Sequence, residues 1–389
     1  CVVTNTGQHK SRQIINRAVR KNPDALVVVT GCYPQTAPQE VAAIPGVDLL
    51  IGNQDRPRIV ELVQAALTQA TVDTSSYVHK LEANTHFEEL SGGNEEDKTR
   101  AYLKIQEGCN QFCTYCIIPY ARGPLRSRSL ANITAEVQRL VDKGYQEVVL
   151  IGIHLGCYGR DLAAGTTLFD AVTAALKVQG LARLRLGSLE SVEVEDRLLQ
   201  LFVTDKRLCP HLHLPLQSGC DKILQAMHRP YTTAKFLHLL QHIRSLVPDI
   251  ALTTDVIVGF PGETETDFAA TGAFVQQCGF AKMHIFPYSE RRGTPAAVLP
   301  DQVPEQVKAQ RAHRLAAVDE RMHRAYRETL LGRTVRVLVE QETAPGLVEG
   351  LSDNYVRVSL PGSASWCSRL VTVRVTGLTD EGVRGERTE

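Results

Sequence analysis

Three closely spaced cysteines constrain this chain more than any other feature of its sequence. Cys109, Cys113 and Cys116 follow a predicted strand with the spacing C-x₃-C-x₂-C. Three thiolates leave one iron of a [4Fe–4S] cube without a protein ligand, so that a small molecule can chelate it. Structural zinc normally has four protein ligands, and no second closely spaced Cys/His pair lies nearby. The spacing therefore favours an iron–sulfur site over a zinc site.

The composition is that of a multi-domain globular protein. The chain has 389 residues, 43% of them hydrophobic and 22% charged, and one core seldom exceeds about 300 residues. No run of 18 apolar residues occurs, so we expect no membrane segment. Ten cysteines without signal-peptide character indicate a reducing compartment, and we expect a cytoplasmic location. The 43 basic residues balance the 43 acidic ones, so affinity for a nucleic acid must come from local patches.

Residues 1–68 alternate apolar strand-like runs with helical stretches, which is typical of parallel βα units. Residues 69–97 are rich in Thr, Ser, Asn and Glu and are interpreted as a linker. The predicted elements of the first region are strands at Val2–Thr4, Leu26–Thr30 and Leu49–Ile51 and a basic helix at Lys10–Arg20.

Residues 98–328 repeat a strand-then-helix pattern six times, which predicts a sheet curled towards a barrel. The first crossover helix has an apolar face, and Gly144 supplies its left-handed stop. A long basic helix follows, from about Gln306 to Leu330. The predicted strands are Ala101–Ile105, Val148–Ile153, Arg183–Leu189, His211–Leu214, Ala251–Val258 and Lys282–Phe286.

In residues 329–389 apolar residues alternate with polar ones, a period of two, and turns are predicted at Pro345–Gly346 and Pro361–Gly362. This pattern predicts a small antiparallel β-barrel of the OB-like sort. The alternating runs are Val335–Val339, Val356–Leu360 and Val371–Val375.

Several further motifs resemble the methylthiotransferases of the radical S-adenosylmethionine (SAM) superfamily, and the resemblance covers essentially the whole chain. Within that family the sequence is most similar to the group that acts on threonylcarbamoyladenosine in tRNA. The motifs are Leu150–Gly156, His213–Gly219, Asp255–Glu263, Phe286–Ser289, Arg291–Ala296, Thr4–Thr6 and Lys10–Gln13.

The resemblance implies an α/β protein with three domains in a fixed order. These are an N-terminal flavodoxin-like methylthiotransferase domain, incomplete here (1–68), a radical SAM partial (βα)6 TIM barrel (98–328) and a C-terminal TRAM β-barrel (329–389). The periodicities described above fall in the same three regions.

The resemblance also implies two cofactor types, SAM and [4Fe–4S] clusters. The first cluster is bound by Cys109, Cys113 and Cys116, which serve as catalytic and metal-binding residues, and Tyr115 lies beside the SAM adenine. Further candidates for SAM contact follow strands, at the face where barrel sites form, although each also fits a structural role. They are Glu190, Gln217, Ser218 and Asp255.

A second, auxiliary [4Fe–4S] cluster is implied for the N-terminal domain, with Cys1 and Cys32 as two of its three ligands. The third ligand should precede Cys1, so we expect that an N-terminal stretch is missing and that sulfur insertion by the chain as given is defective. Judged without the resemblance, Cys1 and Cys32 are a terminal thiol and a buried thiol at a strand end. We interpret the other cysteines as small buried thiols and His154, His211 and His213 as structural or loop residues.

The activity implied by the resemblance is insertion of a methylthio group at C2 of N6-threonylcarbamoyladenosine next to the tRNA anticodon. One SAM methylates sulfur associated with the auxiliary cluster, and a second SAM is reductively cleaved to a radical that removes the C2 hydrogen. The alternatives are a methylthiotransferase for isopentenyladenosine in tRNA or for a ribosomal protein aspartate, and a non-catalytic iron–sulfur RNA-binding protein.

The expected partners are tRNA and a small electron donor such as flavodoxin or ferredoxin, and we expect a monomer. Because the overall charge is balanced, RNA contacts are assigned to local arginines and to the basic helix at Lys308–Arg327, which fix position on phosphates. The terminal barrel is a further RNA platform, with Tyr355 and Trp366 for stacking. The candidate arginines are Arg122, Arg126, Arg128, Arg291 and Arg292.

Overall fold

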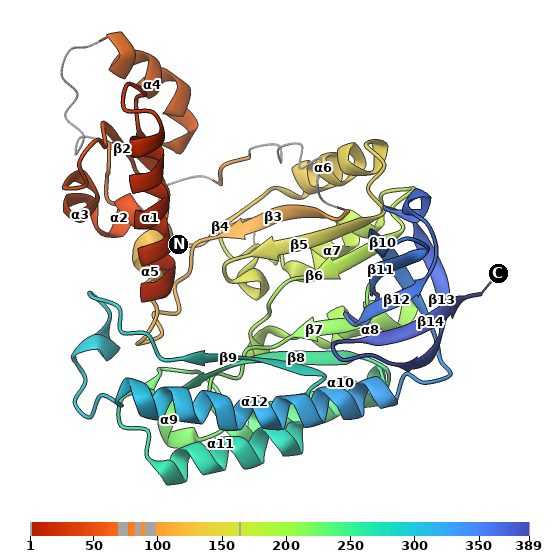
Figure 1. Cartoon of the computed structure of the whole chain (residues 1–389). Helices are drawn as coiled ribbons and strands as arrows, with labels where there is room; N and C mark the ends of the chain where they lie inside the picture. Colours follow the sequence, from red (N-terminus) through yellow and green to blue (C-terminus); the bar gives the residue numbers. More distant parts are fainter. Residues whose placement is uncertain (1, 69–76, 82–86, 90–98, 163–164, 389) are drawn as a thin grey trace. The chain divides into compact units, whose positions relative to one another are not determined.

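The chain forms two units in a computed structural model (Figure 1). The first unit combines residues 1–88, 107–126 and 289–300, and the second combines residues 89–106, 127–288 and 301–389. Cys1 and most of the predicted linker lie outside the described part of the chain. The structure describes residues 2–68, 77–81, 87–89, 99–162 and 165–388.

A short parallel sheet forms the centre of the first unit. Strand β1 (Val28–Thr30) pairs with β2 (Leu49–Ile51), as the βα pattern predicts. Helices surround it, with bounds α1 (Asn5–Lys21), α2 (Cys32–Thr36), α3 (Pro38–Ala42) and α4 (Ile59–Thr68).

The predicted helix at Lys10–Arg20 is confirmed within α1, but the predicted strand at Val2–Thr4 is wrong. Thr4 is the residue that caps α1, because its hydroxyl accepts a hydrogen bond from the N–H of Gly7 at 3.1 Å. The apolar run Val2–Val3 therefore leads into a helix, and Val2 is buried in the core of this unit.

The segment that carries the three cysteines folds with this first unit. Helix α5 (Ile118–Arg122) follows Cys116, and Ala121 is buried in one hydrophobic cluster with Val29 and Leu50. The side-chain amide of Asn53 donates a 2.6 Å hydrogen bond to the carbonyl of Ala121. The cysteine segment is thus anchored on the N-terminal sheet through α5.

The second unit contains the six predicted parallel strands, which confirms the partial barrel. They form two sheets with the orders β4-β3-β5-β6 and β7-β8-β9, and a parallel bridge between Ser188 and His213 links the two sheets. The short strand β4 (Arg126–Ser127) is an addition at the edge. The six strands are β3 (Ala101–Glu107), β5 (Glu147–Gly152), β6 (Arg183–Leu186), β7 (His211–His213), β8 (Ala251–Val258) and β9 (Lys282–Pro287).

Helices cover the outer face of the curled sheet and bury one continuous apolar core against it (Figure 1). None of the helices among the described residues is both long and apolar enough to cross a membrane. The helices are α6 (Leu130–Asp142), α7 (Leu168–Leu176), α8 (Asp196–Thr204), α9 (Asp221–Ala226), α10 (Thr233–Leu246), α11 (Glu265–Cys278) and α12 (Glu305–Glu328).

A closed barrel of five strands ends the chain, as the period of two predicts. Its order is β10-β11-β12-β14-β13, and alternate valines such as Val337, Val358 and Val373 fill the interior. The sequence pattern did not reveal β11 or β14. The strands are β10 (Thr334–Ala344), β11 (Leu347–Ser352), β12 (Arg357–Pro361), β13 (Leu370–Leu378) and β14 (Val383–Arg387).

A buried ion cluster joins the terminal barrel to the parallel strands. Glu147 accepts hydrogen bonds from Arg183 Nε at 2.5 Å and from Arg185 Nε at 2.8 Å, and Glu147 and Arg183 have no solvent exposure. The remaining guanidinium nitrogens donate, at 3.0–3.1 Å, to four main-chain carbonyls of the terminal barrel. Those carbonyls belong to Arg336, Leu351, Ser352 and Asp353.

The substitution Glu147→Gln should destabilise the protein by about 3–5 kcal/mol, because it leaves two buried guanidinium groups without a counter-charge. Urea unfolding of the wild type and the variant measures this cost. The matched control is Glu328→Gln, which breaks the exposed pair with Arg324 and should cost about 0.5 kcal/mol or less. Equal costs for the two variants would contradict the role assigned to the cluster.

The pH dependence provides a second readout of the same variant. Burial acts to raise the pKa of Glu147, but Arg185 and Arg183 outweigh it and hold the pKa below its ordinary value of 4.5. The stabilisation from a lowered carboxyl pKa is present above the unfolded value and is lost as the pH falls through the folded value. The wild type should therefore lose more stability than Glu147→Gln below about pH 4.5.

Candidate functional site

The loop with the three cysteines is closed at its base by contact between main-chain atoms. The N–H of Cys109 donates to the carbonyl of Gly123 at 3.0 Å. Gly108 has a φ of +78°, and a Cβ on it would lie 1.8 Å from the carbonyl oxygen of Pro124. Only glycine permits both the left-handed backbone and this close approach. The two ends of the loop are therefore held together by the chain itself.

The three thiols of this loop fit a cluster with one open iron. Within the described residues Cys109, Cys113 and Cys116 form no disulfide. The N–H of Cys116 donates to the carbonyl of Cys113 at 2.9 Å, which folds their segment into a turn. The N–H of Gln111 points at Cys109 Sγ from 3.4 Å, and donors of this kind stabilise thiolate ligands of iron–sulfur clusters.

Cys32, the predicted ligand of the auxiliary cluster, lies in a positively charged environment in the same unit. It begins α2 and lies within hydrogen-bonding reach of the guanidinium group of Arg122. Burial acts to lower the pKa of Arg122, but Cys32 and Glu107 outweigh it and the net pKa is raised. Arg122 also donates to Glu107 at 2.6 Å. Arg122 thus has both Cys32 and Glu107 as partners.

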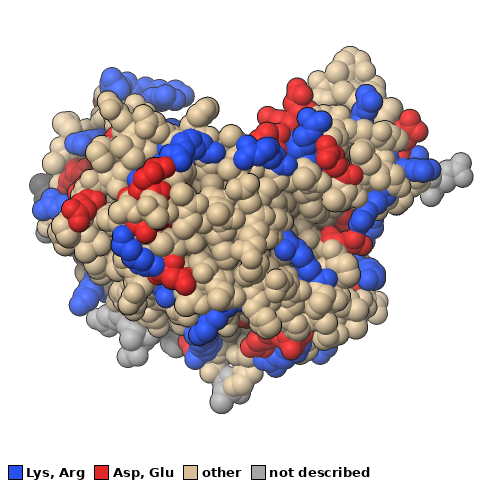
Figure 2. All heavy atoms as spheres, turned by 90° about the horizontal axis from the view of Figure 1, so that it is seen from below, with Lys and Arg blue, Asp and Glu red and all other residues tan. Residues whose placement is uncertain are grey.

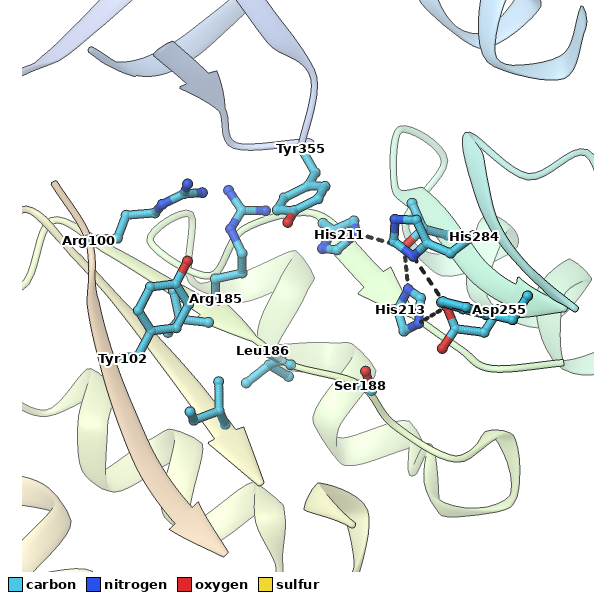
Figure 3. A pocket seen from close by; sticks show the side chains of 15 residues that line it. Arg100, Tyr102, Arg185, Leu186, Ser188, His211, His213, Asp255, His284 and Tyr355 are labelled. Atoms are coloured by element: carbon cyan, nitrogen blue, oxygen red, sulfur yellow. Dashed lines mark hydrogen bonds and ion pairs between the residues drawn. The ribbon is translucent and has the colours of Figure 1, made fainter. Parts of the chain in front are cut away.

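The second unit contains a cavity of about 370 Å³ inside the curled sheet (Figure 3). Its two sides differ in chemistry, because β5 and β6 contribute mainly apolar groups and β7, β8 and β9 contribute polar ones. The volume is in the range of small-molecule sites. The apolar lining includes Val149, Ile151 and Leu186, and the polar lining includes His211, His213, Thr253, Asp255 and His284.

A continuous chain of hydrogen bonds orders the polar side of this cavity. The Thr253 hydroxyl lies 3.0 Å from His211 Nε2 and 2.9 Å from His213 Nδ1. Asp255 Oδ1 lies 3.2 Å from His213 Nε2 and also 3.2 Å from His284 Nδ1. We assign the donors from this geometry: both imidazoles donate to the carboxylate, and Thr253 donates to His213 while it accepts from His211.

The charges of these groups follow from their surroundings. Burial, reinforced by nearby Arg185, lowers the pKa of His211 well below its ordinary value, so this imidazole is neutral. Burial acts to raise the pKa of Asp255, but hydrogen bonds from His213 and His284 outweigh it and lower the pKa to about 2. Asp255 is therefore a carboxylate at neutral pH. The ligand atoms of His213, Asp255 and His284 lie within 4.8 Å of one another, a spacing that also suits a metal ion.

Tyr355 from the terminal barrel closes the cavity at the amino ends of the strands. Its ring stacks on His211 with centroids 4.5 Å apart and an angle of 14° between the rings. The guanidinium group of Arg185 lies over the Tyr355 ring, and its carbon atom is 5.1 Å from the ring centroid (Figure 3). The buried ion cluster thus extends to the base of the cavity.

The other predicted SAM contacts occupy different environments. Glu190 pairs with Arg229, and Gln217 has a φ of +67° and bonds through its main chain to β8. The hydroxyl of Ser218 is fully buried 3.2 Å from the hydroxyl of Thr271 on α11, which favours a structural role. Tyr115 lies in the cysteine loop of the first unit. Of the candidates after strands, Asp255 is the one that lines the cavity.

Of the remaining described cysteines, Cys157, Cys209 and Cys278 are buried as predicted, whereas Cys220 and Cys367 are half-buried. Burial raises the pKa of Cys209 to about 11 and that of Cys278 to about 12. Cys157 Sγ donates to Glu193 at 2.9 Å, and burial raises the pKa of this thiol as well. Its neighbour His154 lies 3.0 Å from the same carboxylate oxygen. This group is held together by hydrogen bonds of a protonated thiol, which favours a structural interpretation.

Most of the arginines predicted to contact RNA are bound within the protein. Arg126 donates to the carbonyl of Arg122 at 2.8 Å, and Arg128 donates to the carbonyl of Lys104 at 3.0 Å. Arg291 bonds to the side chains of Asn5 and Gln8. Because these guanidinium groups have internal partners, we do not propose them as phosphate contacts. Arg292 is exposed.

The predicted basic stripe on α12 is largely neutralised by ion pairs. Arg314 lies 2.7 Å from Glu265, and Arg311 is buried against Glu263 at 2.7 Å. Figure 2 shows the molecule from below the view of Figure 1, and basic and acidic side chains are interspersed on that face. The same pairing extends along the helix, with Lys308–Glu305, Arg324–Glu328 and Arg327–Glu320.

Sequence reasoning missed the contribution of the strand histidines to the cavity. His211 and His213, interpreted as structural, both line it, and His284 and Thr253 were not singled out. A signal was present, because Thr253 and Asp255 are two residues apart, as are His211 and His213, and such pairs share one face of a strand.

The substitution Cys116→Ala should abolish assembly of the cluster at this loop, because two thiolates cannot hold the cube in the same way. Iron and sulfide analysis of the anaerobically reconstituted protein should show a loss of about four irons per chain. The control Cys367→Ala alters a half-buried thiol of the terminal barrel and should keep the full iron content. An unchanged iron content in Cys116→Ala would refute the assignment.

Comparison with known proteins places these sites in a family. The threonylcarbamoyladenosine tRNA methylthiotransferase MtaB of Bacillus subtilis (strain 168) is 41% identical over 380 residues, which cover 96% of this chain and 84% of that protein. The protein of the same name from Aquifex aeolicus (strain VF5) is 37% identical, covering 93% and 86%. A tRNA-2-methylthio-N(6)-dimethylallyladenosine synthase of Acetivibrio thermocellus is 36% identical, covering 94% and 76%.

Family models and solved structures agree with this similarity. The radical SAM superfamily matches residues 103–275, and the uncharacterized protein family UPF0004 matches residues 1–52. The radical SAM methyltransferase TsrM from Kitasatospora setae shares the fold with a TM-score of 0.58 at 16% identity, covering 75% of this chain and 60% of that one. The cysteine loop, the curled parallel sheet and the nearly full-length similarity together show that the chain belongs to the radical SAM tRNA methylthiotransferases, which use SAM and [4Fe–4S] clusters.

Proposed function

We propose that this protein attaches a methylthio group to C2 of N6-threonylcarbamoyladenosine next to the anticodon of tRNA. The proposal is carried by the loop of Cys109, Cys113 and Cys116 in a chain that is 41% identical to a relative named for this substrate. Relatives named for dimethylallyladenosine are 35–37% identical, which makes that nucleoside the second candidate substrate.

The described cysteines that would hold the two clusters all lie in the first unit. Cys109, Cys113 and Cys116 would hold the cluster whose open iron takes SAM, and Cys32 beside Arg122 would contribute to the auxiliary cluster. The bound cluster and SAM supply a radical able to remove hydrogen from an unactivated C–H bond, which acid–base groups cannot do. We retain flavodoxin or ferredoxin as the proposed electron donor.

Most of the predicted arginines have partners within the protein, so we assign the contact with tRNA phosphates to helix α1 instead. None of its 17 residues is acidic and none is buried, and the basic side chains Lys10, Arg17, Arg20 and Lys21 are exposed. The last three line a shallow hollow at the carboxyl end of the helix. The helix dipole favours cations at this end. Arg20 Nε donates to the carbonyl of Asn16 at 3.1 Å, and the exposed parts of the three side chains can contact phosphates.

The terminal barrel supplies a second surface suited to RNA. Arg387 lies over the ring of Trp366 with the guanidinium carbon 4.9 Å from the ring centroid. Arg374 and Arg384 are exposed on the same pair of strands, β13 and β14. Aromatic rings in a positively charged surface are the features on which unpaired bases stack in single-stranded RNA sites.

Nucleoside analysis of tRNA tests the substrate assignment. In a strain that lacks the gene, the methylthio derivative of threonylcarbamoyladenosine should disappear and threonylcarbamoyladenosine should accumulate, and the wild-type gene should reverse both changes. Unchanged levels of this derivative would refute the proposal. Loss of the methylthio derivative of isopentenyladenosine instead would support the second candidate.

Replacing Arg17, Arg20 and Lys21 together by Gln should weaken tRNA binding and reduce its dependence on salt. The plot of log affinity against log salt should become shallower by about 0.7–0.9 for each phosphate that the protein no longer neutralises. Fluorescence anisotropy at several salt concentrations measures both effects. The matched control replaces Arg197, Arg314 and Arg324, three exposed arginines in ion pairs, and should leave the slope unchanged. Equal slopes for the two triple variants would argue against α1.

A further inference from the structure

Tyr355 of the terminal barrel has a backbone conformation that is unfavourable for a residue with a large side chain. Its φ is +66°, in the left-handed region, which glycine adopts freely and an aromatic residue rarely does. The turn between β11 and β12 enforces this conformation. The hydroxyl of Ser352 accepts from the N–H of Val356 at 2.8 Å, and the N–H of Tyr355 donates to the carbonyl of Ser352 at 3.1 Å. A strained residue of this kind indicates a function for its side chain.

The ring of Tyr355 packs against the parallel strands (Figure 3). It was predicted to stack on RNA bases, but it stacks on His211 of β7, with 4.5 Å between the centroids and 14° between the ring planes. His211 is buried, and within the described residues its Nδ1 atom has no hydrogen-bond partner. One hydrogen bond, from Nε2 to the hydroxyl of Thr253 at 3.0 Å, holds the other edge of this imidazole. The stacking on Tyr355 is the second restraint, and it fixes the plane of the ring.

His211 begins a chain of hydrogen bonds that ends at Asp255. The neutral imidazole of His211 has one N–H, which it donates to the hydroxyl of Thr253. The single hydrogen of that hydroxyl then goes to Nδ1 of His213 at 2.9 Å. Nε2 of His213 therefore carries the proton of this ring and donates to Oδ1 of Asp255 at 3.2 Å. Each donor is set by the one before it, so the position of the first ring affects the carboxylate.

The carboxylate at the end of this chain lines the cavity in which we place SAM. Val149 and Ile151 on β5 offer apolar contacts to a flat ring, and Asp255 offers an acceptor for polar hydrogens. The cavity therefore suits a nucleoside such as the adenosyl part of SAM. A carboxylate that is turned away from its partner binds it less well, because hydrogen bonds weaken steeply at poor angles.

We propose that Tyr355 is a positioning residue for SAM, which fixes the ring of His211 and thereby orients the carboxylate of Asp255. This inference rests on the proposed function, because it takes SAM as the molecule that Asp255 contacts. Thr253 and His213 transmit the orientation from one end of the chain of hydrogen bonds to the other. The terminal barrel thus contributes to the SAM site, in addition to the RNA surface proposed above.

The affinity for SAM tests the inference without turnover. The 389-residue chain with reconstituted clusters is equilibrated with SAM by dialysis, without reductant, and the dissociation constant is measured. Tyr355→Gly should weaken SAM binding about two- to tenfold, the range that corresponds to one aromatic stacking contact. Tyr355→Phe should keep the wild-type affinity, because the stacked ring is retained.

Two controls separate positioning from stability. Glycine adopts the left-handed conformation freely, so Tyr355→Gly should unfold in urea with a free energy close to that of the wild type. Ser368→Gly is the matched substitution, because this exposed residue of the terminal barrel has a φ of +65° and is not among the cavity residues. It should leave the affinity for SAM unchanged.

A double variant tests the route through Asp255. Asp255→Asn should itself weaken SAM binding, because it removes the carboxylate. Adding Tyr355→Gly to Asp255→Asn should weaken SAM binding no further, since residues that act through one contact are not additive.

The outcomes separate this inference from the function on which it rests. A wild-type affinity in Tyr355→Gly would overturn the inference, and so would a Tyr355→Phe variant that binds SAM as weakly as Tyr355→Gly. An equal loss from Tyr355→Gly with and without Asp255→Asn would overturn the route through the carboxylate. A wild-type affinity in Asp255→Asn would overturn it as well, and in all these cases the proposed function would stand. A wild-type chain that holds its clusters and binds no SAM would overturn the proposed function together with the inference.

Discussion

Glu147 has no access to water, and two arginines neutralise it on a strand of the parallel sheet. A buried carboxylate is tolerated only with such partners, and each arginine in turn needs acceptors for its other nitrogens. The carbonyls of the turn around Ser352 supply them. That turn carries Tyr355, so the ion cluster also determines which aromatic ring closes the cavity at His211. The buried carboxylate of Glu147 thus helps to fix both the position of the terminal barrel on the parallel strands and the position of Tyr355 at the cavity.

The spacing of apolar residues predicted the strands and helices of the second unit, because its strands are buried and its helices have one apolar face. The period of two in the terminal barrel succeeded for the same reason, since Val335, Val337 and Val339 must face one interior. The strand predicted at Val2–Thr4 failed because three apolar or β-branched residues do not distinguish a strand from a chain end that packs before a helix. There, the capping hydrogen bond of Thr4 decides the outcome.

The cysteine spacing assigns the cluster to one loop, an assignment that stays a prediction, and the charged residues around that loop were harder to interpret. A cluster of arginines after a cofactor loop indicates an anion site when their partners are unknown. In the structure Arg126 and Arg128 bond to carbonyls of their own chain, and such pairing depends on which segments meet in three dimensions. The cavity residues posed the same difficulty. Alternation places Thr253 and Asp255 on one face, but only closure of the sheet shows that this face points inward.

The close approach of Gly108 to Pro124 bears on the order in which the chain folds and the cluster is assembled. The base of the cysteine loop is closed by main-chain atoms, and Ala296 adds a hydrogen bond to the carbonyl of Thr114 at 2.8 Å. The loop therefore does not depend on iron to keep its shape, unlike small zinc domains that unfold when the metal leaves. A folded chain without its cluster would therefore keep the two ends of this loop together, so that a cluster can be assembled on a loop that is already closed.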